Sequence, residues 1–253
     1  MATVTLNDPA HSNTLSASMV TGLASVLTAL STDSTIRAVV LTGAGRSFCL
    51  GARIDDLEQC AQGPPDEVAA RTEARLAELA TVIRCIRSLP CPVIAALNGQ
   101  VAGAGLALAL ACDHRIATER TTLNLAYSRL GASTDGGVSW FLPRMIGHAR
   151  ALELLLGHTV LRGSQALQWG LVTTIVPRDS LLTAAHEHAA SLATLAPHTV
   201  RAGKTLIDAS LTSTLAEHMR REHELFAHGL QTDDMCRGLA AQREGSEPHF
   251  TGD

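Results

Sequence analysis

The sequence has almost no lysine and no paired cysteine motif. Lys204 is the only lysine among 20 lysines and arginines, and the 253-residue chain has a formal net charge of −4. The concentrated basic face that nucleic-acid binding requires is therefore not expected. Six scattered cysteines without a C-x-x-C pair argue against a disulfide framework or a zinc site. We expect reduced, mostly buried thiols, and we interpret the single lysine as a habit of composition without functional meaning.

Long apolar runs are also missing. The longest, Val101 to Cys112, is shorter than the roughly 18 residues that span a bilayer. The start, MATVTLNDP, has no basic segment followed by an apolar one, as a secretion signal would have. No pair of histidines shows the H-E-x-x-H spacing, so we expect no metal site. These absences predict a soluble, cytoplasmic protein.

The remaining composition, 46% hydrophobic, is enough to bury a full core. Up to Pro177, short segments rich in Val and Ile alternate with stretches of helical periodicity, which predicts an α/β domain over residues 1–177. After Pro177 the strand pattern ends, which predicts a helical region over residues 178–253. The expected strands are 37–43, 92–99 and 171–176. The expected helices are 15–30, 65–88, 179–195, 199–211, 215–230 and 233–243.

The segment NGQVAGAGLALALACDHRIA (98–117) joins a glycine-rich turn to an apolar stretch. Leu and Ala are strong helix formers and no β-branched residue lies between Ala102 and Asp113, so we predict a buried helix. Its first N–H groups, around Gly103, Ala104 and Gly105, have no partner within the helix and suit negative charge. Alternatively, the glycines serve only close backbone packing. The lysine-serine ending of a phosphate loop is absent.

A second glycine turn, TGAGRSFCLGARIDDL (42–57), also follows an expected strand. With these two glycine turns, the sequence resembles the crotonase superfamily of enoyl-CoA hydratases and isomerases. RAVVLTGAGRSFCLGA is similar to the first signature of that family, and NGQVAGAGLALALACDHRIA to the second. The resemblance continues through LGASTDGGVSWFLPRMIG (130–147), SQALQWGLVTTIVP (164–177) and the terminal HFTG, and so covers nearly the whole chain.

The resemblance implies an α/β fold, a spiral of ββα units followed by C-terminal helices that build a trimer or a dimer of trimers. It implies an acyl-CoA substrate, with CoA as part of the substrate and no separate cofactor. By motif position, the backbone N–H groups of Ala52 and Ala104 form an oxyanion hole for a thioester enolate. The residues expected to contact the substrate are Leu50, Gly51, Arg53, Gly103, Ala107, Tyr127 and Trp140.

The sequence departs from the hydratases of the family at both glutamate positions. Ala107 and Tyr127 stand where those enzymes carry glutamates, and neither side chain can serve as a base for water at neutral pH. Asp135 stands where the isomerases carry the carboxylate that moves a proton between C2 and C4. We therefore predict an enoyl-CoA isomerase with Asp135 as its only acid and base, working with the oxyanion hole.

Several alternatives stay open at this point. Asp135 in TDGG could instead cap the following helix, and Tyr127 could be a pocket wall or donate to substrate or to Asp135. The chain could be a lyase or hydrolase for a malonyl-type or other specialised thioester, or a catalytically degenerate scaffold. A structural role is expected for Asp113.

CoA binding is expected to differ from that of the relatives. Gly245 and Ser246 replace basic residues that commonly meet the CoA phosphates in the family. A carrier-protein thioester is therefore an alternative to free CoA, unless Arg46, Arg53 and Arg243 compensate.

Overall fold

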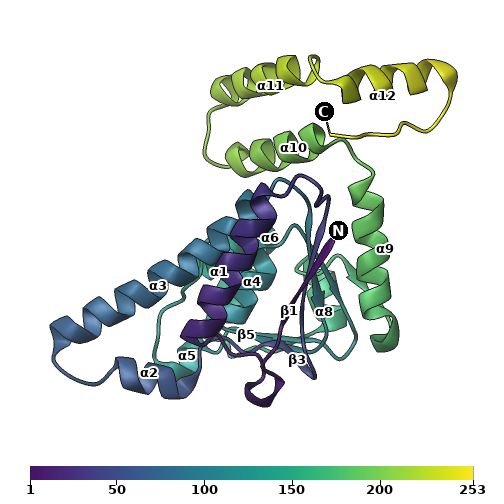
Figure 1. Cartoon of the computed structure of the whole chain (residues 1–253). Helices are drawn as coiled ribbons and strands as arrows, with labels where there is room; N and C mark the ends of the chain where they lie inside the picture. Colours follow the sequence, from purple (N-terminus) through teal and green to yellow (C-terminus); the bar gives the residue numbers. More distant parts are fainter. Residues whose placement is uncertain (253) are drawn as a thin grey trace.

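The computed structural model describes residues 1–252 and contains two β-sheets surrounded by helices (Figure 1). The strands are β1 (Ala2–Leu6), β2 (Val39–Gly43), β3 (Ser47–Cys49), β4 (Val93–Leu97), β5 (Gln100–Ala102), β6 (His114–Ala117), β7 (Thr122–Asn124), β8 (Leu161–Arg162) and β9 (Thr174–Ile175). The helices of the first 177 residues are α1 (Ala17–Thr32), α2 (Ile54–Cys60), α3 (Pro65–Ser88), α4 (Ala104–Ala111), α5 (Tyr127–Leu130), α6 (Val138–Ile146), α7 (His148–Leu156) and α8 (Gly163–Trp169). They are followed by α9 (Leu181–Ala193), α10 (Pro197–Ser210), α11 (Leu215–Gly229) and α12 (Asp233–Glu244). Short 3₁₀ turns lie at Pro9–His11 and Arg178–Ser180.

From β2 to β7, successive strands alternate between the two sheets. One sheet has the order β1-β2-β4-β6-β9 and is parallel throughout. The other has the order β3-β5-β7-β8, in which only β8 is antiparallel to its neighbour. Each pair β2-β3, β4-β5 and β6-β7 thus gives one strand to each sheet before the chain enters a helix. This repetition is the spiral of ββα units, so the predicted fold class is confirmed.

The central strands are buried on both faces, as expected for a parallel sheet covered by helices. Val39 and Leu41 of β2 face a core shared with α1, α3 and α4, whereas Val40 faces a second cluster that includes Leu181 and Ala185 of α9. Helix α9 therefore packs on the sheet, while α10, α11 and α12 form a separate layer beyond it (Figure 1). The predicted boundary at residue 177 stays a prediction, and α9 lies with the core.

The expected elements mostly agree with the structure. The helix predicted over 65–88 has those bounds, and the LALALA segment is helical, with every residue of α4 buried. The strand expected over 171–176 is shorter, because only Thr174–Ile175 pairs with β6. Within residues 1–252, no helix is both long enough and apolar enough to cross a lipid bilayer.

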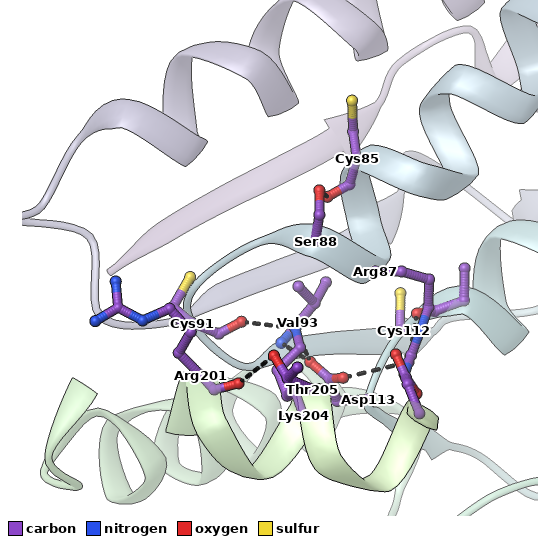
Figure 2. Close-up of polar contacts among 12 residues, drawn as sticks. Cys85, Arg87, Ser88, Cys91, Val93, Cys112, Asp113, Arg201, Lys204 and Thr205 are labelled. Atoms are coloured by element: carbon purple, nitrogen blue, oxygen red, sulfur yellow. Dashed lines mark hydrogen bonds and ion pairs between the residues drawn. The ribbon is translucent and has the colours of Figure 1, made fainter. Parts of the chain in front are cut away.

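Asp113 connects helix α10 to the core (Figure 2). Its carboxylate accepts hydrogen bonds from the N–H of Val93 and from Nζ of Lys204, both at 2.8 Å. Arg87 of α3 lies 3.4 Å from the same carboxylate and also pairs with Asp208 of α10. The only lysine of the chain is therefore a structural link, which corrects its interpretation as a habit of composition. The structural role expected of Asp113 agrees with these contacts.

We predict that Asp113→Ala lowers the free energy of unfolding by about 3 kcal/mol, because it leaves a mostly buried ammonium group without its counter-ion. The free energy is measured by urea denaturation followed by circular dichroism. Glu119→Ala, which removes an exposed acid from the loop between β6 and β7, is the matched control and is expected to change little. Equal effects of the two substitutions would contradict the assigned role of Asp113.

Candidate active site

The two glycine turns lie side by side because they follow neighbouring strands. Strands β3 and β5 pair in parallel, so the turns at Gly51 and Gly103 leave the same edge of the sheet. Both glycines have positive φ angles, 81° and 50°, which side chains rarely adopt. A Cβ on Gly51 would lie 2.9 Å from the carbonyl oxygen of Ala102 and 3.0 Å from the amide nitrogen of Ala104. Glycine at 51 therefore permits the close approach of the two turns.

The turns present two free N–H groups, those of Ala52 and Ala104. Ala104 is the first residue of α4, so its N–H has no acceptor within the helix. Among the hydrogen bonds found in residues 1–252, none uses the N–H of Ala52 or of Ala104 as donor. The buried helix adds the positive end of its dipole at the same place. This arrangement can bind a carbonyl oxygen that gains negative charge during a reaction.

Asp135 is positioned by a close contact between its loop and helix α4. Gly136 has a φ of 56°, and a Cβ built on it would lie 2.6 Å from Cβ of Ala107. The loop can approach α4 this closely only because residue 107 is small and residue 136 has no side chain. The space that a longer side chain at 107 would need is therefore filled by the loop that carries Asp135.

The carboxylate of Asp135 does not cap the following helix. The N-cap residue of α6 is Gly137, and no side chain accepts a hydrogen bond there. Oδ1 of Asp135 instead accepts a hydrogen bond of 2.6 Å from the hydroxyl of Tyr127. The capping alternative is thus wrong. Of the roles left open for Tyr127, the structure shows donation to Asp135.

Burial sets the protonation of this pair. It raises the pKa of the Asp135 carboxyl above its ordinary value, although the hydrogen bond from Tyr127 acts in the opposite direction. Burial, followed by the nearby charge of Asp135, raises the pKa of Tyr127 well above its ordinary value. The phenol therefore stays protonated at neutral pH and acts as a donor, while Asp135 is a stronger base than an exposed aspartate.

Tyr127 is the only tyrosine of the chain, so its ionisation can be followed alone. We predict that the ultraviolet absorbance of phenolate stays absent from the folded protein until the pH is well above about 10, the value of a free tyrosine. The same titration in concentrated denaturant is the control and is expected to show ionisation near pH 10. Ionisation of the folded protein at the ordinary pH would contradict the buried hydrogen bond.

A cavity of about 70 Å³ brings the predicted catalytic groups together. Ala52, Ala104 and Asp135 all line it, and within the described residues 1–252 no other acid does. Its other walls are mainly apolar and come from α1, α2, α3 and the segment before α1. These lining residues are Leu15, Val20, Leu57, Cys60, Thr72, Arg75, Leu76 and Leu79.

The remaining predicted substrate contacts lie around or away from this cavity. Ala107 is covered by Gly136, and Leu50 precedes the first glycine turn in a half-buried position. Arg53 is paired with Asp8 at 2.8 Å. Trp140 is 41% exposed and lines a different cleft, beside α10, where Arg144 stacks on its ring at 4.0 Å. The structure thus places Trp140 outside the cavity that holds Asp135.

Sequence reasoning missed Arg75, which lines the cavity from α3. Its guanidinium pairs with Asp56 at 2.8 Å and donates to the carbonyl oxygen of Leu15 at 3.1 Å. It thereby ties α2, α3 and the segment before α1 together around the cavity. The helical periodicity of 65–88 marked only apolar positions, and an arginine 19 residues from its partner carries no local signal.

Within residues 1–252, no cluster of three or more His, Cys, Asp or Glu side chains is arranged to hold a metal ion.

Comparisons with known proteins agree with the observed fold. The family model described as "Enoyl-CoA hydratase/isomerase" matches residues 1–253. The 1,2-epoxyphenylacetyl-CoA isomerase of Escherichia coli K12 is 35% identical over 250 residues, covering 99% of this chain and 94% of that protein. The 4-chlorobenzoyl coenzyme A dehalogenase-2 of an Arthrobacter species is 31% identical over 225 residues, covering 89% and 80%. The crystal structure of an enoyl-CoA hydratase from Bacillus anthracis superposes with a TM-score of 0.91 at 32% identity, covering 99% of this chain and 95% of the other.

The chain therefore belongs to the enoyl-CoA hydratase/isomerase family, and the resemblance to the crotonase superfamily is confirmed. Relatives of similar identity carry names for isomerisation, hydration and dehalogenation. The family thus defines an enzyme for acyl-CoA substrates, and the reaction depends on the side chains at the site.

Proposed function

We propose that this enzyme is an enoyl-CoA isomerase that moves a C=C bond of an acyl-CoA thioester with Asp135 as its single acid and base. One observation carries the proposal: among residues 1–252, Asp135 is the only acid that lines the cavity also lined by Ala52 and Ala104. An oxyanion hole with one carboxylate is sufficient for a proton shift between two carbons. No other cofactor is required, since CoA is part of the substrate.

The reaction follows from these groups. Asp135 removes a proton from C2 of a 3-enoyl thioester, and the electrons of that C–H bond form a dienolate. The N–H groups of Ala52 and Ala104 hold its negative oxygen. Asp135, now a carboxylic acid, returns the proton to C4, so that the double bond moves from C3–C4 to C2–C3. The two steps together neither add nor remove atoms, and the carboxylate is regenerated.

Hydration is less well supported by the same groups. Addition of water needs one group that deprotonates the water and one that delivers a proton to C2. Ala107 has no functional group, and Tyr127 is a protonated donor already bonded to Asp135. A lyase, hydrolase or scaffold is also less well supported, because a carboxylate and an open cavity are both present.

The cavity favours a short acyl group. Its volume of about 70 Å³ is small for a ligand site, although CoA itself would lie outside it. Arg46 and Arg243 are exposed and remain candidates for the CoA phosphates, with a carrier-protein thioester as the alternative. The cytoplasmic location and the absence of a metal or further cofactor stay predictions.

We also propose that α10 and α11 mediate assembly into a homotrimer or a dimer of trimers. Ile207, Leu215 and Phe226 are large apolar residues of these helices, and each is more than 65% exposed in the single chain. Such a surface is typical of an interface. Light scattering after size exclusion is expected to give the mass of three or six chains, and a monomer would contradict the proposal.

The proposed reaction is tested with a matched pair of substrates. 3-Enoyl-CoA and 2-enoyl-CoA thioesters of four to ten carbons are each incubated with the enzyme, and products are separated by liquid chromatography with mass detection. The proposal predicts that 3-enoyl-CoA becomes 2-enoyl-CoA of the same mass, fastest at short chain length. Gain of one water by 2-enoyl-CoA without isomerisation of 3-enoyl-CoA would overturn it in favour of a hydratase.

A further inference from the structure

The backbone around Tyr127 is held at the edge of the sheet that carries the oxyanion hole. Strand β7 pairs in parallel with β5, so the turn after β7 leaves that edge beside the turns at Gly51 and Gly103. In this turn Ala126 has a φ of 62°, and its N–H donates to Oδ1 of Asn124 at 2.9 Å. Tyr127 follows directly, as the first residue of α5. The three turns thus leave the same edge of the sheet, two of them with the N–H donors and the third with Tyr127.

Tyr127 is joined to the Asp135 loop twice. Its carbonyl oxygen accepts a hydrogen bond from the N–H of Ala132 at 3.1 Å, and its hydroxyl donates to Oδ1 of Asp135 at 2.6 Å. Its side chain is only 6% exposed and does not line the cavity, so it reaches the site only through Asp135. Tyr127 is therefore held in place both through its backbone carbonyl and through its hydroxyl.

Asp135 has no other side-chain partner that fixes it. Within residues 1–252, the hydrogen bond from Tyr127 is the only one found for its carboxylate with another residue. No side chain caps helix α6, so no capping hydrogen bond orients the carboxylate of Asp135. Oδ1 thus accepts from Tyr127, and Oδ2 has no hydrogen bond from another of the described residues.

We propose that Tyr127 is a positioning residue that holds Oδ1 of Asp135 so that Oδ2 alone exchanges protons with the substrate. The proposal rests on the proposed function, in which Asp135 serves both C2 and C4. When Oδ2 carries the proton, Oδ1 is still a carbonyl oxygen and still accepts from the phenol. The hydrogen bond therefore persists through the whole cycle and keeps the same oxygen aimed at both carbons.

The first test replaces the phenol by a ring without a hydroxyl. Tyr127→Phe keeps the volume of the buried side chain and removes only the donor. We expect kcat to fall by roughly 10- to 100-fold, the loss typical of a misplaced catalytic group, with KM little changed. The acidic limb of kcat/KM against pH is expected to move to higher pH, because a carboxylate that loses a donor is protonated more easily. A change in KM alone would instead identify Tyr127 as a wall of the pocket.

The second test strengthens the donor in the same position. Because Tyr127 is the only tyrosine, growth on a fluorinated tyrosine modifies this site alone. Fluorination makes the phenol more acidic and the hydrogen bond stronger, so the acidic limb is expected to move to lower pH, opposite to Tyr127→Phe. The Tyr127→Phe variant grown on the same amino acid is the matched control and is expected not to change. Shifts in the same direction for both substitutions would overturn the proposal.

A third readout separates this inference from the proposed function. The pH at which Asp135 titrates is measured by ¹³C NMR of labelled aspartate in the enzyme without substrate, with Asp135→Asn to assign the signal. If the two substitutions shift this titration in opposite directions, the positioning role stands even when no isomerisation is found. If neither shifts it, the positioning role is wrong even in an active isomerase.

Discussion

Replacement of Asp135 by asparagine is expected to lower kcat/KM for a 3-enoyl-CoA by about 10²- to 10⁴-fold, the usual contribution of a general acid-base group. Asparagine keeps the size of the side chain, and its Oδ1 can still accept from the hydroxyl of Tyr127. It cannot take a proton from C2. Because the oxyanion hole is unchanged, affinity for the thioester is expected to stay close to that of the wild type. Steady-state kinetics and calorimetric binding of a saturated acyl-CoA measure the two effects.

Asp55→Asn is the matched control for this substitution. Asp55 is an exposed acid on α2 that lies close in sequence to Ala52 but does not line the cavity. We expect it to leave kcat/KM within about twofold, since surface substitutions away from a site usually change little. An Asp135→Asn enzyme as active as Asp55→Asn would show that another group is the base.

Ala107→Glu is expected to abolish isomerisation without creating a hydratase. It restores a glutamate at a position where hydratases of the family carry one. In this chain Gly136 fills the space beside Cβ of Ala107, so the new side chain must displace the loop that carries Asp135. Overpacking of a buried position costs about 1 to 3 kcal/mol in the free energy of unfolding. Urea denaturation and product analysis with both enoyl-CoA isomers measure the two effects.

Ala107→Ser provides the control, because it adds one small polar atom and keeps the loop contact nearly unchanged. It is expected to retain most of the isomerase activity. If Ala107→Glu instead gained hydratase activity at undiminished stability, the contact between Gly136 and Ala107 would not define the site. The site would then be that of a hydratase that lacks only its glutamates.

Much of the fold was predictable because local patterns and tertiary structure agree. The apolar positions of α3 recur at helical spacing, and Leu and Ala in α4 favour helix even though their alternation fits a strand. Ala52 and Ala104 were predicted as oxyanion-hole residues from glycine turns within family motifs. The structure brings both to one cavity with Asp135.

The remaining features depend on contacts between distant segments. The fit of Gly136 against Ala107 arises where two segments meet, and neither residue signals it alone. Lys204 gave no signal as a lone lysine, yet it bonds Asp113, which lies 91 positions earlier in the chain. Trp140 was expected at the substrate because it lies within a family motif. Helical geometry directs its side chain to the cleft beside α10 instead.

The choice between capping and catalysis for Asp135 was also beyond the sequence. The sequence Thr-Asp-Gly-Gly before a helix is typical of an N-cap, and the same four residues are also compatible with an active-site loop. The positive φ angles of Gly136 and Gly137, 56° and 82°, make Gly137 the N-cap and leave the carboxylate of Asp135 to Tyr127. Backbone geometry, which the sequence does not specify, excludes the capping role.

The transfer of one labelled proton tests the central claim most directly. A 3-enoyl-CoA that carries deuterium at C2 is converted in ordinary water in a single turnover, and the product is analysed by NMR. If Asp135 alone serves both carbons, part of the deuterium is expected at C4 of the product, in competition with exchange into water. A product in which the hydrogen added at C4 comes entirely from solvent, while unreacted substrate keeps its full label, would contradict transfer by one carboxylate.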